Sequence, residues 1–570
     1  MRKLLKYLKG YEKESIIGPL FKMLEASFEL IVPIIMANII DVGIKNQDIS
    51  YIIKSGVILV ILGVLGLTCS ITAQYYAAKA ALGFGTALRK DLFHHINTLS
   101  YSELDVLGTS TLITRMTNDI NQAQTGVNQV LRLFLRSPFI VIGAFIMALT
   151  ISVKMTIIFA VSIPILTLII YGIIAYTIPL YKKVQKKLDV VSKSTRENLA
   201  GVRVVRAFSR QTAEMSEFEE NSDGLYRLQI FVGKVSALLN PMTYIIVNFA
   251  IIAIIWSGGF EVESGAMSQG DIISLVSYMT QILLALVVLS NLIVTFTKAT
   301  ASASRINDVF AIHSSLSDEG AKPQIEVEEA NKVEFKDVDF YYQNAQEPSL
   351  SKISFAVKPG ETIGIIGGTG AGKSTLVNLI PRFYDGTKGS ILVDGVPVGA
   401  YPFQQLRDKI GIVPQKAVLF SGTIRQNMQW GKADATDEEI YRALEIAQAK
   451  EFVDAKEAGL DTVILQGGKN LSGGQRQRLT IARALVGNPD ILILDDSASA
   501  LDYATDAKLR KAIAEQTKNM TVFIVSQRAA SLKHADQILV LDDGEMAGIG
   551  THEELLETCD IYKEICSSQL

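Results

Sequence analysis

The chain has 570 residues, of which 49% are hydrophobic, and its formal net charge is −3. This length exceeds what one hydrophobic core supports, so two or more domains are expected. The mean hydropathy of +0.28 is high for a soluble protein, and the apolar excess lies in the first 300 residues. The absence of a basic tract from the sequence argues against a nucleic-acid partner. The three cysteines show no metal-ligand spacing.

Six apolar stretches are each about as long as the 20 residues that cross a bilayer. They lie near residues 16–40, 52–77, 130–151, 155–179, 235–256 and 272–296. The connections near 78–129 and 180–234 are long and rich in Lys and Arg, whereas the other three are short. The excess of positive charge predicts that the long connections are cytoplasmic. The sequence therefore predicts a multi-pass protein of the plasma membrane with both termini in the cytoplasm.

The long connections have helical periodicity, so the spans are expected to continue as helices beyond the membrane. Each pair of extended helices is predicted to be joined by a short crosswise piece, near residues 100–113 and 209–222.

Charged side chains occur within two of the spans. Glu25 and Glu29 are one helical turn apart in the first span, and Arg132 and Arg136 repeat this spacing in the third. Charges are costly in lipid, so such residues usually face a cavity or one another. Two interpretations stay open for these four residues, a contribution to a substrate path and ion pairing near a helix end.

The pattern becomes polar after residue 296 and divides the chain into three parts. Residues 1–311 form the predicted α-helical membrane domain, and residues 312–331 form a charged linker that contains Pro and Gly. Residues 332–570 form the second domain, which opens with residues 333–342, an alternating segment typical of an edge strand.

A glycine-rich segment in this second domain predicts a phosphate-binding loop. Residues 367–375, GGTGAGKST, match the pattern G-x-x-x-x-G-K-[ST] between a strand-like run at 362–366 and an apolar helical pattern. Backbone amides of such a loop surround phosphates, its lysine reaches the β- and γ-phosphates, and its serine binds Mg²⁺. The predicted ATP-binding residues of the loop are Gly367, Gly368, Thr369, Gly370, Ala371, Gly372, Lys373, Ser374 and Thr375.

A second segment, at residues 471–502, contains LSGGQ, a helix pattern and an apolar strand at 491–494. The strand ends in Asp495 and Asp496, which could supply the carboxylate that holds Mg²⁺. Together these motifs resemble the nucleotide-binding domain of ATP-binding-cassette (ABC) proteins. The whole layout resembles a half-transporter of the ABC exporter type, six helical spans fused to an α/β P-loop ATPase domain.

The resemblance implies roles for individual residues. Tyr342 would stack on adenine, Gln415 would reach Mg²⁺ and the γ-phosphate, and Asp495 and Ser374 would hold Mg²⁺. The signature residues and the aspartate of the following loop would contact ATP bound to the opposite subunit; these are Leu471, Ser472, Gly473, Gly474, Gln475 and Asp502. The cofactors implied are therefore ATP and Mg²⁺, and two nucleotide-binding domains are needed to complete a site.

Three positions depart from the family pattern. Asp496 stands where the family has the glutamate that acts as general base, and it is one methylene shorter. Gln527 stands where the family has a histidine that contacts the γ-phosphate, and glutamine cannot carry its charge or its proton. Gln466 stands where many exporters carry a glutamate. The predicted catalytic residues are Asp496, Gln527 and Gln415. The occurrence of Asp496 and Gln527 in the same site indicates that it binds ATP and hydrolyses it poorly.

These departures resemble the degenerate-site subunit of heterodimeric bacterial multidrug exporters. The resemblance implies a transport ATPase that exports amphipathic small molecules, in contact with membrane lipid, with a second half-transporter subunit supplying the missing Glu and His. A dedicated exporter of one lipid, peptide or porphyrin, a homodimeric exporter, and an ATP-gated channel or sensor remain as alternatives.

Overall fold

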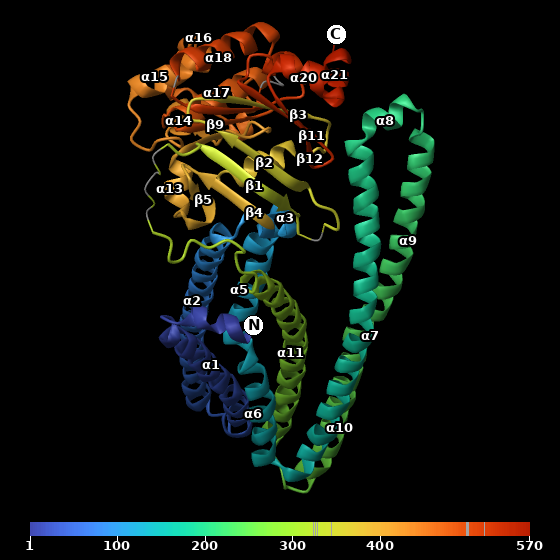
Figure 1. Ribbon diagram of the computed structural model, residues 1–570. Coiled ribbons are helices and arrows are strands. Elements are labelled where there is room, and N and C mark those ends of the chain that lie inside the picture. The colour runs from blue at the N-terminus through green and yellow to red at the C-terminus, as the bar shows by residue number, and fades with distance from the viewer. Residues whose placement is uncertain are drawn as a thin grey trace. The chain divides into compact units, whose positions relative to one another are not determined.

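The structure is a computed structural model that describes every residue except 323, 325–326, 328, 344, 498–500, 518 and 570. The chain divides into two compact units (Figure 1). The first comprises Met1–Asn97 and Ser110–Ile312, and the second comprises Thr98–Thr109 and His313–Leu570. A short piece of chain between two long helices therefore belongs to the C-terminal unit.

The first unit is helical, and each predicted apolar stretch lies in a long helical segment made of one or more helices. Among the described residues, six helical segments are long and apolar enough to cross a membrane. The helices are η1 Arg2–Leu8, α1 Glu12–Asn38, η2 Ile39–Ile44, α2 Ile49–Thr98, α4 Thr109–Thr114, η3 Arg115–Asp119, α5 Ile120–Gln129, η4 Val130–Phe134, α6 Arg136–Ile151, α7 Val153–Ala200, α8 Val202–Ala207, α9 Gln211–Ala237, α10 Leu239–Glu263 and α11 Gln269–Phe310. The α-helical membrane domain predicted from the sequence is thereby confirmed.

The helices extend beyond the length that a bilayer requires, as predicted. Helix α2 has 50 residues and α7 has 48, more than twice the number that crosses a membrane. The second crosswise piece was predicted at 209–222, and this position is wrong, because α9 already begins at Gln211. The crosswise piece is α8, which closes the end of the α7–α9 hairpin (Figure 1). Gly201 ends α7, and Ser209, at φ +52°, turns the chain into α9.

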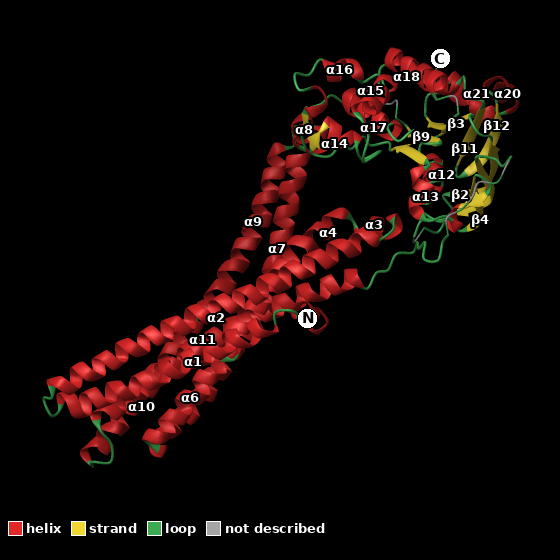
Figure 2. Ribbon diagram, turned by 90° about the vertical axis from the view of Figure 1, so that its left-hand side faces the viewer, coloured by secondary structure: helices red, strands yellow, loops and turns green. Residues whose placement is uncertain are grey.

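Helix α11 is the centre of the first unit and packs against α1, α5, α6 and α10. Figure 2 shows α1 and α11 running side by side. Two hydroxyl groups of α11 tie the pair together, because Ser274 Oγ donates to the Pro33 carbonyl and Tyr278 Oη donates to the Leu30 carbonyl, both at 2.7 Å. Such bonds compensate for the missing hydrophobic drive between helices in lipid.

The second unit contains a four-stranded antiparallel sheet in the order β2-β1-β4-β5. Its strands are β1 Val333–Phe340, β2 Leu350–Val357, β4 Lys388–Val393 and β5 Val396–Pro397. Strand β1 was predicted to be an edge strand, and this is wrong, because it lies between β2 and β4. Its alternating pattern, with Val333, Phe335, Val338 and Phe340 buried, comes from one face packing on the core rather than from an edge position.

The other sheet has six strands in the order β12-β11-β3-β10-β9-β6. All neighbours are parallel except β12, which pairs with β11 antiparallel. The strands are β3 Thr362–Gly367, β6 Ile410–Val413, β9 Ile491–Asp495, β10 Thr521–Val525, β11 Gln537–Asp542 and β12 Glu545–Gly550. Side chains from both sheets form one hydrophobic core. The predicted α/β fold of this domain is confirmed.

The helices of the second unit surround these sheets, and a small third sheet joins β7 Gly422–Thr423 to β8 Val463–Ile464. The longer helices are α15 Asp437–Ile446, α17 Gly473–Leu485 and α18 Tyr503–Gln516. The shorter ones are α3 Tyr101–Leu107, α12 Lys373–Leu379, η5 Val398–Ala400, α13 Phe403–Asp408, α14 Ile424–Met428, α16 Lys450–Asp454, η6 Gly459–Asp461, η7 Gln466–Gly468, α19 Ala529–Leu532, α20 His552–Thr558 and α21 Asp560–Ser567.

Candidate functional site

The site lies where three neighbouring parallel strands end. Strand β10 lies between β3 and β9, so the carboxyl ends of all three meet at one edge of the sheet. The glycine-rich loop follows β3, Asp495 ends β9, and Gln527 follows β10. Open α/β sheets bind ligands at this edge. Strand order alone therefore brings together motifs that are more than a hundred residues apart in the sequence.

The glycine-rich loop leads directly into helix α12, which begins at Lys373. Gly372 has φ +90°, and a Cβ atom at this position would lie 2.6 Å from the Ser349 carbonyl oxygen, so only glycine fits without strain. Lys373 Nζ folds back and donates to the carbonyl oxygens of Gly367 at 2.9 Å and Gly368 at 2.5 Å. This loop with a cation at its centre, opening a helix, suits a polyphosphate.

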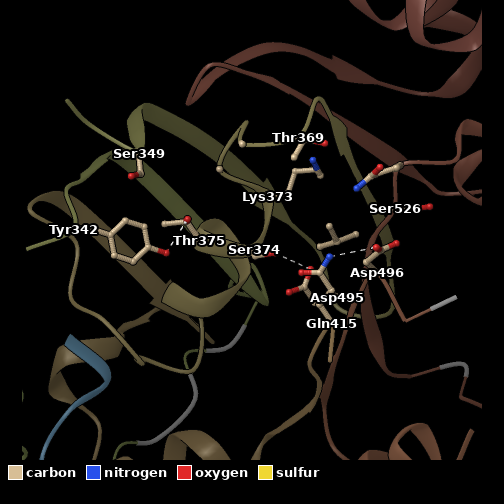
Figure 3. Close-up of a pocket in the computed structure, with 14 residues that line it drawn as sticks. Tyr342, Ser349, Thr369, Lys373, Ser374, Thr375, Gln415, Asp495, Asp496 and Ser526 are labelled. Carbon is tan, nitrogen blue, oxygen red and sulfur yellow. Dashed lines mark hydrogen bonds between the residues drawn. The ribbon is translucent and has the colours of Figure 1, made fainter. Parts of the chain in front are cut away.

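Two carboxylates face the loop (Figure 3). Ser374 Oγ donates a hydrogen bond to Asp495 Oδ1 at 3.0 Å, and Gln415 Nε2 lies 3.5 Å from Asp496 Oδ2. Hydroxyl, amide and carboxylate oxygens are the ligands that Mg²⁺ prefers, so these residues fit the metal ion that accompanies a nucleotide. Asp496 has φ +45°, a costly conformation for a residue other than glycine that is common at functional sites.

Burial shifts the pKa of both charged partners inside the pocket. Burial raises the pKa of Asp495, and the Asp496 charge acts in the same direction, against the Ser374 hydrogen bond and the Lys373 charge. Burial lowers the pKa of the Lys373 ammonium, although Asp496 and Asp495 oppose this shift. Both charges are thus less stable than in water, and a bound Mg²⁺ and phosphate would compensate them.

An aromatic side chain stands at the other end of the pocket. Tyr342 shares a hydrogen bond with Thr375 Oγ1 at 3.0 Å (Figure 3). Its ring also contacts Phe340 and Tyr384 edge to face, with centroids 4.9 and 5.5 Å apart. The ring is thereby fixed at the side of the pocket opposite Asp496.

A cavity of about 270 Å³ connects these groups. Its lining includes the following residues predicted from the sequence: Tyr342, Thr369, Gly370, Gly372, Lys373, Ser374, Thr375, Gln415, Asp495, Asp496 and Gln527. The predicted loop residues Gly367, Gly368 and Ala371 belong to the same turn without lining the cavity. Ser349, Val525 and Ser526 also line it and were missed. Val525 and Ser526 directly precede Gln527 in the chain and could have been included, whereas no local pattern identifies Ser349.

The signature segment does not line this cavity. Ser472 is the N-cap of α17, since its Oγ accepts from the Gln475 amide at 3.2 Å and the Gln475 side chain accepts from the Ser472 amide. Leu471 is buried, and Gly473 and Gly474 form the first turn of the helix. Asp502 caps α18 in the same way, by accepting from the Thr505 amide at 2.8 Å. The predicted positions that concern the opposite subunit are therefore separate from this chain's own pocket.

The loop that carries Gln527 is held by a residue that the sequence did not indicate. Gln569, just after α21, donates through Nε2 to the Gln527 carbonyl at 2.7 Å and accepts at Oε1 from the Ala529 amide at 2.8 Å. Between them, the Arg528 guanidinium lies over the Tyr503 ring, 4.8 Å from its centroid. The Gln527 loop is thus connected to the C-terminal helices and to the start of α18.

Helix α3, the first predicted crosswise piece, belongs to the second unit. Tyr384 Oη donates to the Asp105 carboxylate at 2.7 Å, and the Tyr101 ring packs on Phe383 with centroids 4.6 Å apart. At the start of α3, Glu103 accepts from the backbone amides of Ser100 and Ser315. Since Tyr384 also contacts Tyr342, a continuous set of side chains connects α3 to the pocket.

The charged residues predicted in the spans fall into two separate groups. Glu25 pairs with Lys22 at 2.6 Å, both buried, and Lys22 also donates to Ser70 of α2. Glu29 instead accepts two hydrogen bonds from Arg136 Nη2, at 2.7 and 2.8 Å. Glu25 and Glu29 therefore bind different partners, although the two glutamates are spaced like the two arginines in the third span.

The family models match both parts of the chain. The model described as "ABC transporter transmembrane region" matches residues 15–286, and "ABC transporter" matches residues 350–499. The "Uncharacterized ABC transporter ATP-binding protein YfiB" of Bacillus subtilis is 38% identical over 569 residues, which cover 100% of this chain and 98% of that protein.

Two further relatives carry more specific names. The "Probable multidrug resistance ABC transporter ATP-binding/permease protein YheI" of Bacillus subtilis is 34% identical, with 84% of this chain and 81% of that protein covered. The "ATP-dependent lipid A-core flippase" of Chromobacterium violaceum is 30% identical, with 100% and 97% covered.

Among solved structures, a bacterial Atm1-family ABC exporter with ATP bound shares the fold, with a TM-score of 0.80, 23% identity and 98% of both chains covered. The six spans and these matches make the protein a multi-pass protein of the plasma membrane, with the ATPase domain in the cytoplasm. The chain belongs to the ABC transporter family, as a half-transporter of the exporter type that joins six spans to one nucleotide-binding domain.

Proposed function

We propose that the chain is one half of a heterodimeric exporter of amphipathic compounds and that its own pocket retains ATP and hydrolyses it slowly. Lys373 and the loop amides would bind the phosphates, Ser374, Gln415 and Asp495 would hold Mg²⁺, and Tyr342 would stack on adenine. When bound, Mg²⁺ would neutralise the negative charge that develops on the phosphate. Every named group lines or adjoins the one cavity described above.

The proposal of slow hydrolysis rests on which residues line the pocket opposite Lys373. The position of the general base is filled by Asp496, which is held at the end of β9 by the bond from its amide to the Val525 carbonyl at 3.0 Å. Its carboxylate is one methylene shorter than glutamate, and a displacement of about 1 Å can cost on the order of 100-fold in rate. Gln527, which also lines the pocket, cannot replace the charge of a histidine.

The separate signature segment supports a role for the chain in a second site. With intact LSGGQ at the start of α17, this chain would complete the ATP site of a partner that has Glu and His at the two altered positions. ATP binding would close the two domains, and hydrolysis at the partner's site would reopen them. During this cycle, the cavity between the spans would open first to one side of the membrane and then to the other.

The experiment is the steady-state ATPase activity of the purified chain alone, beside the Asp496→Glu, Gln527→His double variant. We expect the wild-type chain to be nearly inactive and the double variant to gain turnover on the order of tenfold or more. Asp543→Glu is the matched control, because Asp543 also has a positive φ, 45°, but does not line the pocket. Wild-type turnover of about 1 s⁻¹ or more, an ordinary enzyme rate, would refute the proposal in favour of a homodimeric exporter.

A second candidate is a dedicated lipid exporter. It is favoured by the similarity to the lipid A-core flippase of Chromobacterium violaceum, at 30% identity over nearly the whole chain. Transport of a fluorescent phospholipid but of no amphipathic drug, in vesicles that contain both subunits, would select this candidate.

A further inference from the structure

A cavity within the first unit combines apolar walls with polar atoms that have no partner. It has a volume of about 330 Å³ and lies between α1, α6 and α11. Its apolar lining consists of Val32, Ile140, Leu284, Ala285 and Val288. Its polar lining consists of Glu29, Arg136 and Gln281, one residue from each helix.

The polar residues satisfy one another only in part. Arg136 Nη2 binds both carboxylate oxygens of Glu29, and Gln281 Nε2 donates to the Glu29 carbonyl at 3.3 Å. Arg136 Nε and Gln281 Oε1 are buried, and neither has a hydrogen-bond partner in the described part of the chain. Two residues that line this cavity therefore carry one donor and one acceptor without a partner. Leaving such buried groups unpaired is unfavourable, so a ligand that pairs with them is favoured.

A second arginine gives the cluster an excess of positive charge. Arg132 lies four residues before Arg136 in the π-helical segment η4, which packs on α1 and α11 as α6 does. Its Nε is also buried without a partner, and among the ion pairs of the described residues none includes Arg132. Arg132 does not line the cavity itself, and Arg136 is paired with Glu29, so Arg132 is the charge here that has no ion-pair partner among the described residues. π-Helical segments frequently mark functional sites, and a charge at membrane depth is retained only where something compensates it.

We propose that this cavity binds the anionic head group of an amphipathic molecule, a carboxylate or phosphate monoanion attached to an aliphatic chain. The anion would bind between Arg132 and Arg136, a neighbouring N–H or O–H of the ligand would donate to Gln281 Oε1, and the chain would lie against the apolar wall. The inference rests on the proposed export function and names its substrate class. The Glu25–Lys22 pair is excluded from the site, because its two charges already compensate each other.

The test measures binding without nucleotide to the full chain in phosphatidylcholine nanodiscs, with empty discs as background. The probes are N-dodecanoylglycine, its methyl ester, dodecyltrimethylammonium and N-acetylglycine. We expect the dodecanoyl acid to bind at least tenfold more tightly than the ester and the cation, and N-acetylglycine to bind weakly because it has no chain. Equal binding of acid and ester would overturn the proposal without any variant.

Variants then locate the site. Arg132→Gln and the charge-neutral pair Glu29→Gln, Arg136→Gln are expected to remove most of the preference for the acid. Lys154→Gln is the matched control, because Lys154 pairs with Glu261 outside the cavity, and it should leave the preference unchanged. An undiminished preference in both arginine variants would overturn the assignment.

Two additional comparisons separate the possible sources and the two proposals. Displacement of the probe by phosphatidylglycerol in the disc identifies an anionic lipid as the occupant, and no displacement identifies a free amphiphile. Because the assay contains no ATP, its failure leaves the ATPase proposal intact. Ordinary ATPase turnover of the chain alone, conversely, would leave the head-group site intact.

Discussion

The hydrogen bond between Tyr384 and Asp105 offers a direct test of how α3 is held on the nucleotide-binding fold. The Tyr384 hydroxyl donates to the Asp105 carboxylate at 2.7 Å, and burial, followed by this carboxylate, raises the pKa of Tyr384 well above its usual value. Tyr384→Phe removes only the hydroxyl, since the ring contacts with Tyr101 and Tyr342 remain possible. The perturbation therefore isolates one bond between α3 and the domain.

The expected magnitude follows from the exposure of the two partners. Hydrogen bonds to charged groups contribute about 1.5–3 kcal/mol. Tyr384 is buried, but Asp105 is exposed, so water can replace the hydroxyl and the loss falls to about 1 kcal/mol. Since 1.4 kcal/mol corresponds to a factor of ten, local opening of α3 should become about fivefold more frequent.

Hydrogen exchange of the amides of Tyr101–Leu107, measured by mass spectrometry on the full chain, reports this opening. Tyr384→Phe and Asp105→Ala should each accelerate exchange about fivefold, and the double variant should exchange no faster than either. Tyr562→Phe is the control, because Tyr562 bonds His552 at 2.7 Å within a different hydrophobic cluster. Unchanged exchange in α3, or effects that add in the double variant, would refute the proposed attachment.

Three further outcomes are expected. Gln569→Ala removes two hydrogen bonds to the Gln527 loop. In the Asp496→Glu, Gln527→His background it should lower kcat several-fold with little change in KM. Substitution of the neighbouring residue, Ser568→Ala, should leave kcat unchanged. Burial raises the pKa of Asp495, so the ionised carboxylate lowers the stability of the folded protein as pH rises. Asp495→Asn should therefore raise the Tm of the metal-free protein at pH 8 but not at pH 4. Gly126→Ala would place Cβ 2.2 Å from Ala299 Cβ, so thermal unfolding in detergent should show a loss of about 1–3 kcal/mol.

Local patterns in the sequence predict the elements of this protein well. Membrane spans are recognisable because a run of about 20 apolar residues is the length that crosses a bilayer and is rare in other structures. The strand at 362–366 and the strand that ends in Asp495 are recognisable because an apolar run stops abruptly at a motif. Each of these signals lies within a short window of the chain.

Arrangements that depend on distant residues were not predictable in the same way. The prediction that β1 is an edge strand was wrong, because alternating apolar and polar residues indicate one buried face and not the number of neighbouring strands. The second crosswise helix was placed too late, because Gly201 was not used as a helix end. Glu25 and Glu29 lie one helical turn apart, but Glu25 pairs with Lys22 of its own helix, whereas the packing of α1 on α6 gives Glu29 its partner Arg136.

The separation of α17 from the pocket explains why the altered residues need not disable a transporter. Asp496 and Gln527 belong to the pocket that this chain supplies, whereas Ser472 and Gly473 begin a helix at a different place in the same domain. Changes in the first group affect only the site built on Lys373. In the proposed heterodimer, the chain could therefore lose hydrolysis at its own pocket while keeping the surface that a partner's ATP would require. In a homodimer the same changes would affect both sites, and the intact signature would serve little purpose.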